Sequence, residues 1–187
     1  FFFFFWRFFV AAVLAALMTG CGSDERKPVP RRKAYARVEL PDTAMRAADD
    51  TPLHMPVNAS ARTECPRPGW LDISYPTLGA TVHVTFTKAA GIEELERVKA
   101  NRMQRLMLNA GEGESESGEF SNGHGFNIYI MKSEGVATPI QFLATDDSAW
   151  VVSGAAYFNI KPGPGAVDSL RPMVDAVERD ILKSMGD

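Results

Sequence analysis

The stretch "WLDISYPTLGATVHVTFTK", Trp70–Lys88, decides the fold of this chain, because polar and apolar residues alternate along both of its halves. Such alternation predicts two half-buried strands, each with one apolar and one polar face. The segment "PTLGA" between them predicts a tight turn, so the stretch is expected to form an antiparallel hairpin. The second strand has three apolar residues on one face and three polar residues on the other: Val82, Val84 and Phe86 against Thr81, His83 and Thr85.

Other segments extend this pattern into a larger sheet. Residues 34–41 ("AYARVELP") and 126–132 ("FNIYIMK") alternate in the same way, and residues 139–160 predict two further strands around the turn "TDDS". Residues 42–68 carry four prolines with little periodicity, so we expect an extended loop there. Residues 112–125 ("EGESESGEFSNGHG") read as an acidic, solvated loop.

Two segments have the apolar periodicity of amphipathic helices. Residues 91–111 have an approximate apolar stripe and end at Gly111, and residues 168–185 have a second stripe. In the second helix we expect Ser169 as the N-cap and Pro172 at the third helical position, where a missing N–H is harmless. The stripes are Ile92, Leu95, Val98, Met103, Leu106 and Met107, and Leu170, Met173, Val174, Val177, Ile181 and Leu182. The predicted fold class is α+β, a single domain in which an antiparallel sheet is flanked by two main helices.

The N-terminal segment reads as a targeting signal rather than as part of the fold. After Arg7 comes an apolar run that is short for a membrane span, then Gly20 and Cys21. This arrangement resembles the lipobox of bacterial lipoproteins, in which the signal is cleaved before a lipidated cysteine. Acylation, for example by palmitate, would then anchor the chain stably to a membrane. We therefore predict a signal peptide at 1–20, a lipidated Cys21 with a flexible tether at 21–33, and a folded domain at 34–187.

The order of these blocks is similar to that of the GldD-type gliding motility lipoproteins of Bacteroidota. The resemblance rests on the lipid cysteine, the strand ending in Leu-Pro, the "ISYP" strand and the closing pattern "YFN…DSL.P…D…DI". It implies a cell-envelope lipoprotein required for gliding and for type IX secretion, with no known catalytic residue to transfer. The layout also vaguely resembles PsbP-like domains. Asp24 and Glu25 resemble a surface-export signal of Bacteroidota, but a merely solvated tether explains them equally well, so the membrane and its face stay open.

Residues capable of chemistry are few and scattered. His54, His83 and His124 lie far apart and outside any metal-ligand spacing, so no metal or cofactor is expected. His83 lies on the polar face of a strand, where it either contacts a ligand or acts as an ordinary hydrogen-bonded sheet residue. Cys65 lacks a nearby catalytic partner and is expected to be buried or free.

The acidic residues also favour structural roles. Asp146 and Asp147 are neighbours in a turn and are expected to cap backbone N–H groups rather than to form a catalytic pair. The acidic segment at 112–119 lacks the alternating ligands of a calcium loop. Thr43, in an Asp-Thr-Ala sequence, is the candidate that we would test for O-glycosylation in Bacteroidota.

The sequence is compatible with two functions. The first is a non-catalytic, membrane-anchored lipoprotein that contacts the bilayer through Cys21 and contacts other envelope proteins of the gliding and secretion machinery. The second is a small-ligand-binding or hydrolytic envelope lipoprotein that uses the His83 face of the sheet. The net charge of −3, from 20 basic and 23 acidic residues, argues against nucleic acid as a partner. The first function is favoured, and no enzymatic activity is expected.

Overall fold

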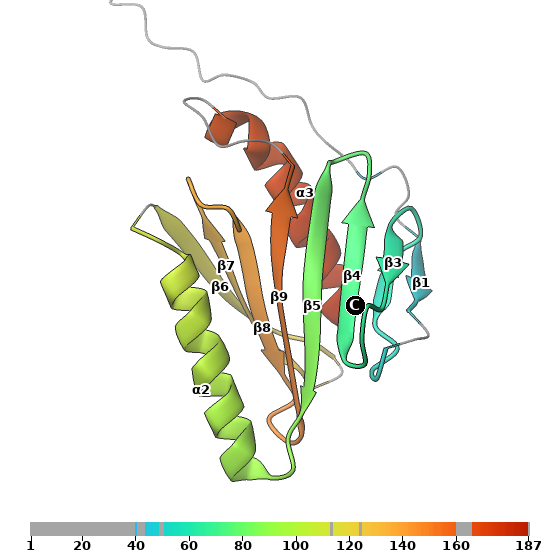
Figure 1. Ribbon diagram of the computed structural model, residues 1–187, viewed down its shortest axis with the longest axis vertical. Coiled ribbons are helices and arrows are strands. Elements are labelled where there is room, and N and C mark those ends of the chain that lie inside the picture. The colour runs from blue at the N-terminus through green and yellow to red at the C-terminus, as the bar shows by residue number, and fades with distance from the viewer. Residues whose placement is uncertain are drawn as a thin grey trace, which may run out of the picture. The chain divides into compact units, whose positions relative to one another are not determined.

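The predicted hairpin lies within the main sheet of a computed structural model of the chain (Figure 1). The structure describes residues 40, 44–48, 51–112, 114–123, 125–159 and 166–186, all within the unit Tyr35–Asp187. The predicted signal segment, Cys21, the tether, Thr43 and His124 lie outside the described residues, as does all of the expected strand at 34–41 except Leu40.

Seven strands form the main sheet, and every neighbouring pair is antiparallel, which confirms the predicted sheet. In spatial order they are β3 (Arg62–Glu64), β4 (Trp70–Tyr75), β5 (Ala80–Lys88), β9 (Trp150–Phe158), β8 (Ile140–Thr145), β7 (Asn127–Ser133) and β6 (Ser115–Ser121). The β5–β9 pair is long and brings the predicted hairpin against the last strand of the chain. Gly154 allows β9 to pack closely between β8 and β5, because a Cβ atom there would lie 2.5 Å from the Phe142 ring on β8 and 2.8 Å from the carbonyl oxygen of His83 on β5.

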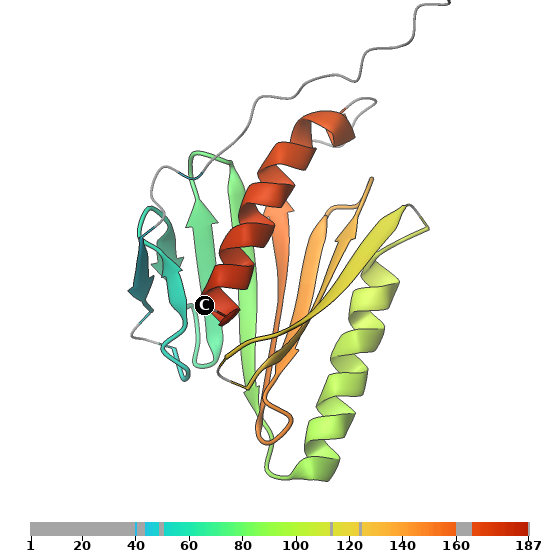
Figure 2. The ribbon, with the colours of Figure 1, turned by 180° about the vertical axis from the view of Figure 1, so that it is seen from behind.

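The two predicted helices pack on opposite faces of this sheet. Helix α2 (Ile92–Asn109) shares a core cluster with Leu143 and Val151, whereas α3 (Ala166–Gly186) shares the larger core with Phe142 and Val152. Because consecutive strand residues point to opposite faces, these neighbouring positions place one helix on each side. Figure 2 shows α3 crossing the face that is hidden in Figure 1.

Two expected loops contain strands. Within residues 42–68, β1 (Met45–Ala47) and β2 (Pro56–Asn58) form a small antiparallel sheet, and β3 joins the main sheet. The acidic loop expected at 112–125 contains β6, which pairs with β7 along its whole length. Both expectations were wrong because these strands are short or lie at an edge, and β6 exposes nearly all of its side chains, so no hydrophobic pattern marks it.

The helices differ from expectation at their ends. Helix α3 begins at Ala166 rather than after Ser169, so the predicted N-cap is wrong and Pro172 lies inside the helix. A proline there removes a backbone hydrogen bond and crowds the preceding turn. In α2, Leu95 and Leu106 are buried as predicted, but Ile92 and Met107 are 64% and 49% exposed, so the predicted stripe was too wide.

Candidate functional site: the open face of the sheet

Helix α2 covers only part of the sheet face on which it lies. It packs over β7, β8 and the start of β9, as the cluster of Leu95, Met131, Leu143 and Val151 shows. The remaining side chains of β4, β5 and β9 on this side form what we call the open face. They stand in three cross-strand rows: Trp70, Thr85 and Ser153; Asp72, His83 and Ala155; Ser74, Thr81 and Tyr157.

The centre of the open face is an imidazole–carboxylate pair. His83 and Asp72 lie directly opposite each other on β5 and β4, and Nδ1 of His83 is 2.6 Å from Oδ1 of Asp72. Their side chains are 44% and 25% exposed. The Tyr157 ring meets the His83 ring edge to face, with 5.3 Å between ring centroids. The imidazole is therefore oriented by one carboxylate and one aromatic ring.

This pair lacks the third member of a hydrolytic triad among the described residues. No hydroxyl or thiol in that part of the chain hydrogen-bonds to His83, and its partner on β9 is the methyl group of Ala155. Cys65 is half-buried against the larger core. The open face can therefore hold or hydrogen-bond a ligand, but its geometry provides no activated nucleophile.

Asp72 is the partner that the sequence interpretation of His83 missed. The information was present in the hairpin, because the pairing of Tyr75 with Ala80 next to the turn places Asp72 opposite His83 three residues farther on. Cross-strand pairs of this kind interact directly on one sheet face. Composition and spacing along the chain alone did not reveal the contact.

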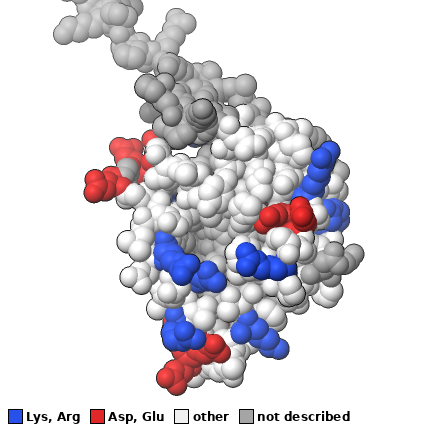
Figure 3. Space-filling view, in the orientation of Figure 1, with Lys and Arg blue, Asp and Glu red and all other residues white. Residues whose placement is uncertain are grey.

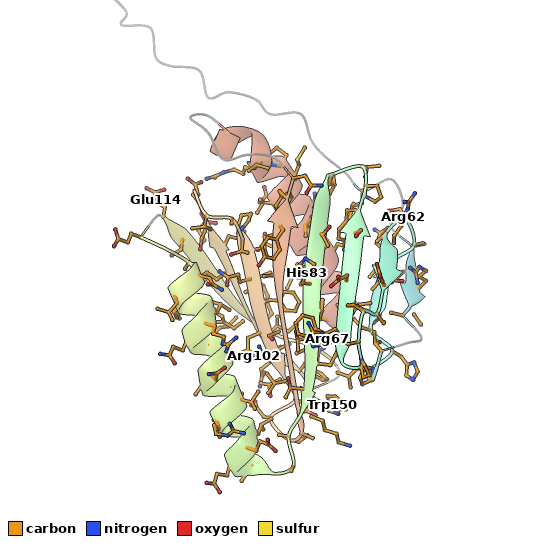
Figure 4. All side chains as sticks on the ribbon, in the orientation of Figure 1. Arg62, Arg67, His83, Arg102, Glu114 and Trp150 are labelled. Atoms are coloured by element: carbon orange, nitrogen blue, oxygen red, sulfur yellow. The ribbon has the colours of Figure 1, made fainter. Side chains whose placement is uncertain are left out.

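Arginine side chains border the open face. Arg67 stacks on the Trp70 ring, with its guanidinium carbon 3.8 Å from the ring centroid. Figure 4 shows Arg102 on the side of α2 that faces the open strands, with Arg67 and His83 beyond it. In the same orientation, Figure 3 shows a hollow on this face with Lys or Arg side chains on both sides and with Asp or Glu side chains next to the basic group on the right. Burial, and then the like charge of Arg105, lower the pKa of Arg102.

Of the two turn aspartates, Asp146 has the predicted capping role, whereas Asp147 instead binds side chains. Oδ1 of Asp146 accepts hydrogen bonds from the backbone N–H groups of Ser148, Ala149 and Trp150, at 2.8–3.0 Å. Burial alone would raise the pKa of Asp146, but these hydrogen bonds outweigh it and lower the pKa to about 2. Asp147 joins α2 to β7 through Lys99, at 2.7 Å, and Asn127, at 2.7 Å.

A cavity of about 540 Å³ lies elsewhere, between the ends of β6 and β7 and helix α3. Both of its basic side chains are already paired with carboxylates: Lys132 lies 2.9 Å from Glu178 and 3.5 Å from Glu116, and Arg171 lies 2.7 Å from Glu134. His54 lines a smaller cavity of about 270 Å³ with mostly apolar neighbours. Within the described residues, no group of three or more His, Cys, Asp or Glu side chains could hold a metal ion.

A buried polar contact ties α3 to the sheet. The carboxylate of Asp180, 2% exposed, accepts hydrogen bonds from the hydroxyl of Tyr75 and, at 3.1 Å, from the amide of Asn58. Burial, the negative charge of Asp180 and this hydrogen bond raise the pKa of Tyr75 above its ordinary value. The "ISYP" strand and the "DI" of the closing pattern therefore meet at this contact.

The sequence also matches a known protein family. A family model described as gliding motility lipoprotein GldD matches residues 25–186. No curated protein matches the chain. Among the described residues, neither helix is long and apolar enough to cross a membrane.

Proposed function

The chain belongs to the GldD family of gliding motility lipoproteins, and from this premise we propose that it is a non-catalytic component of the gliding and associated secretion machinery. A lipoprotein of this family is anchored to a membrane of the cell envelope. We propose Cys21 as the lipidated residue. In this proposal the domain acts by contacting other envelope proteins.

The observation that carries the proposal is the exposure of the open face and of the adjacent side of α2. Tyr157 on the open face is 44% exposed, and Leu108 on α2 is 74% exposed. Aromatic and arginine side chains are enriched in protein interfaces. An exposed surface of this composition, with no nucleophile at His83 among the described residues, supports recognition rather than catalysis.

A second candidate follows from the short contact between His83 and Asp72. A carboxylate-oriented imidazole can act as a general base, so a ligand-binding or hydrolytic role on the open face is the alternative. Exchange of His83 for Gln separates the two. Gliding that persists with His83→Gln favours the contact role, whereas loss of gliding with normal protein abundance and unchanged crosslinks to partner proteins favours the chemical role.

Crosslinking in gliding cells tests the first proposal. The full-length chain is crosslinked in living cells, purified from membranes in detergent, and its crosslinked peptides are identified by mass spectrometry. We expect crosslinks between this chain and gliding or secretion proteins, and we expect Cys21→Ser to remove the chain from the membrane fraction. Crosslinks to unrelated proteins alone, or normal gliding in a strain without the gene, would contradict the proposal.

A further inference from the structure

Two arginines in the second half of α2 stand out because nothing in the described chain neutralises them. Earlier in the same helix, Arg97 lies 3.2 Å from Glu94, and Lys99 lies 2.7 Å from Asp147. Among the described residues, no carboxylate lies within salt-bridge distance of Arg102 or Arg105. Arg102 and Arg105 carry like charges, and Arg102 is half-buried. Their electrostatic repulsion is therefore unfavourable until an anion binds between them.

These arginines share one side of α2. Arg102 and Arg105 are three residues apart and therefore form one stripe along α2, whereas Leu108, about 120° around the helix from Arg102, lies beyond its exposed end. We call it the arginine stripe. Figure 4 places Arg102 on the side of α2 toward the open face, and Figure 3 shows the hollow there with basic side chains on both sides. Ser153 and Ala155, two of the three open-face residues of β9, are small and leave room on the open face.

Acidic residues beside this surface define what can occupy it. Glu64 and Asp72 are paired neighbours on β3 and β4, and Glu93 and Glu94 lie in the first turn of α2. A membrane with anionic headgroups would bring negative charge against these acids as well as against the arginines. A narrow chain segment with one or two carboxylates can reach the arginines alone.

We propose that the arginine stripe, with Arg67 across the hollow, binds an acidic segment of a partner protein. The carboxylates of that segment pair with Arg102 and Arg105, and its apolar side chains lie against Leu108 and Tyr157. Planar guanidinium groups suit bidentate carboxylate pairing, and Arg67 is already oriented by its stacking on Trp70. This inference rests on the proposed contact role and specifies the chemistry of the contact.

Binding measurements on the full-length chain in detergent test the inference. The probes are fluorescein-labelled hexaglutamate, hexalysine and vesicles that contain phosphatidylglycerol. We expect hexaglutamate to bind in a salt-sensitive manner, and Arg102→Gln/Arg105→Gln to weaken its binding by about tenfold or more. Arg97→Gln is the matched control on the same helix and should leave binding unchanged. Because Arg105 is exposed, Arg105→Gln alone reports the effect if the double variant folds poorly.

Three outcomes would overturn the inference. These are no preference for hexaglutamate over hexalysine, equal binding by wild type and the Arg105→Gln variant, and binding to the vesicles that Arg102→Gln/Arg105→Gln weakens, without binding to hexaglutamate. The last would identify a lipid surface as the occupant. Failure of the proposed function is distinguishable, because it appears as normal gliding in a strain without the gene, whatever the peptide binding shows.

Discussion

Removal of one hydroxyl group at Tyr75 should destabilise the domain measurably. Tyr75 is 2% exposed and its hydroxyl donates a hydrogen bond to the buried carboxylate of Asp180. Tyr75→Phe keeps the packed ring but leaves that carboxylate with Asn58 as its one remaining side-chain donor among the described residues. A hydrogen bond to a charged group contributes about 1.5–3 kcal/mol, so the free energy of unfolding should fall by about that amount.

For a unit of this size, such a loss corresponds to a decrease in Tm of about 3–12 °C. The measurement is urea unfolding of wild-type and variant proteins followed by tryptophan fluorescence and circular dichroism. Tyr157→Phe is the matched control, because the Tyr157 side chain is 44% exposed, and its effect should stay within about 0.5 kcal/mol. An unchanged midpoint for Tyr75→Phe would refute the stabilising role of the contact.

The contact between Tyr75 and Asp180 also predicts that the free energy of unfolding depends on pH. The pKa of Tyr75 is raised in the folded state, by burial first and then by Asp180, whereas in the unfolded chain it is about 10. The stabilisation is therefore complete below pH 10 and is lost as the pH rises above 10, by about 1.4 kcal/mol per pH unit. Tyr75→Phe lacks this loss, so the stability difference between wild type and variant should narrow above pH 10. A difference that stays constant would contradict this assignment.

Three further substitutions test individual features of the fold. The buried amide nitrogen of Gln141 has no hydrogen-bond partner among the described residues, so Gln141→Met should raise the free energy of unfolding by about 1 kcal/mol in urea unfolding; a decrease would show that the amide is satisfied. Asp146→Ala removes the acceptor of three turn N–H groups and should cost about 1.5–3 kcal/mol at pH 7, with a smaller difference as the pH falls from 4 toward 2; a constant difference in acid would contradict the lowered pKa of Asp146. Pro172→Ala restores a helical N–H and should slow amide hydrogen exchange in the first turns of α3; unchanged exchange would favour a helix that begins after Ser169.

Much of the fold could be predicted because its signals are local. The alternation of Val82, Val84 and Phe86 with polar neighbours predicts β5, and a stripe around Leu95 and Leu106 predicts α2. The edge strand β6 was missed because its backbone pairs with β7 while nearly all of its side chains stay in solvent, which leaves no periodic pattern. The start of α3 was misplaced because Ser169 and Pro172 match a helix-start signal that the structure does not use.

The candidate site was harder to predict from the sequence than the fold, because it depends on the register between strands and on where the helices pack. Pairing of Asp72 with His83 follows from the turn, but the approach of Arg102 to the same face depends on how α2 packs on β8 and β9. The contact of Tyr75 with Asp180 joins residues 105 positions apart and depends on the packing of α3. Neither the approach of Arg102 to the open face nor the contact of Tyr75 with Asp180 has a local sequence pattern that would predict it.

The central claim, that the exposed side of α2 contacts another envelope protein, can be tested most directly by site-specific photocrosslinking in gliding cells. A photoreactive amino acid replaces Leu108 in the full-length chain, and the matched control replaces Lys183, an exposed residue of α3 on the opposite side of the sheet. The account predicts a discrete adduct with one gliding or secretion protein from position 108, which Arg105→Glu in the same chain abolishes, and no such adduct from position 183. Equal adducts from both positions, or an adduct at position 108 that persists with Arg105→Glu, would contradict it.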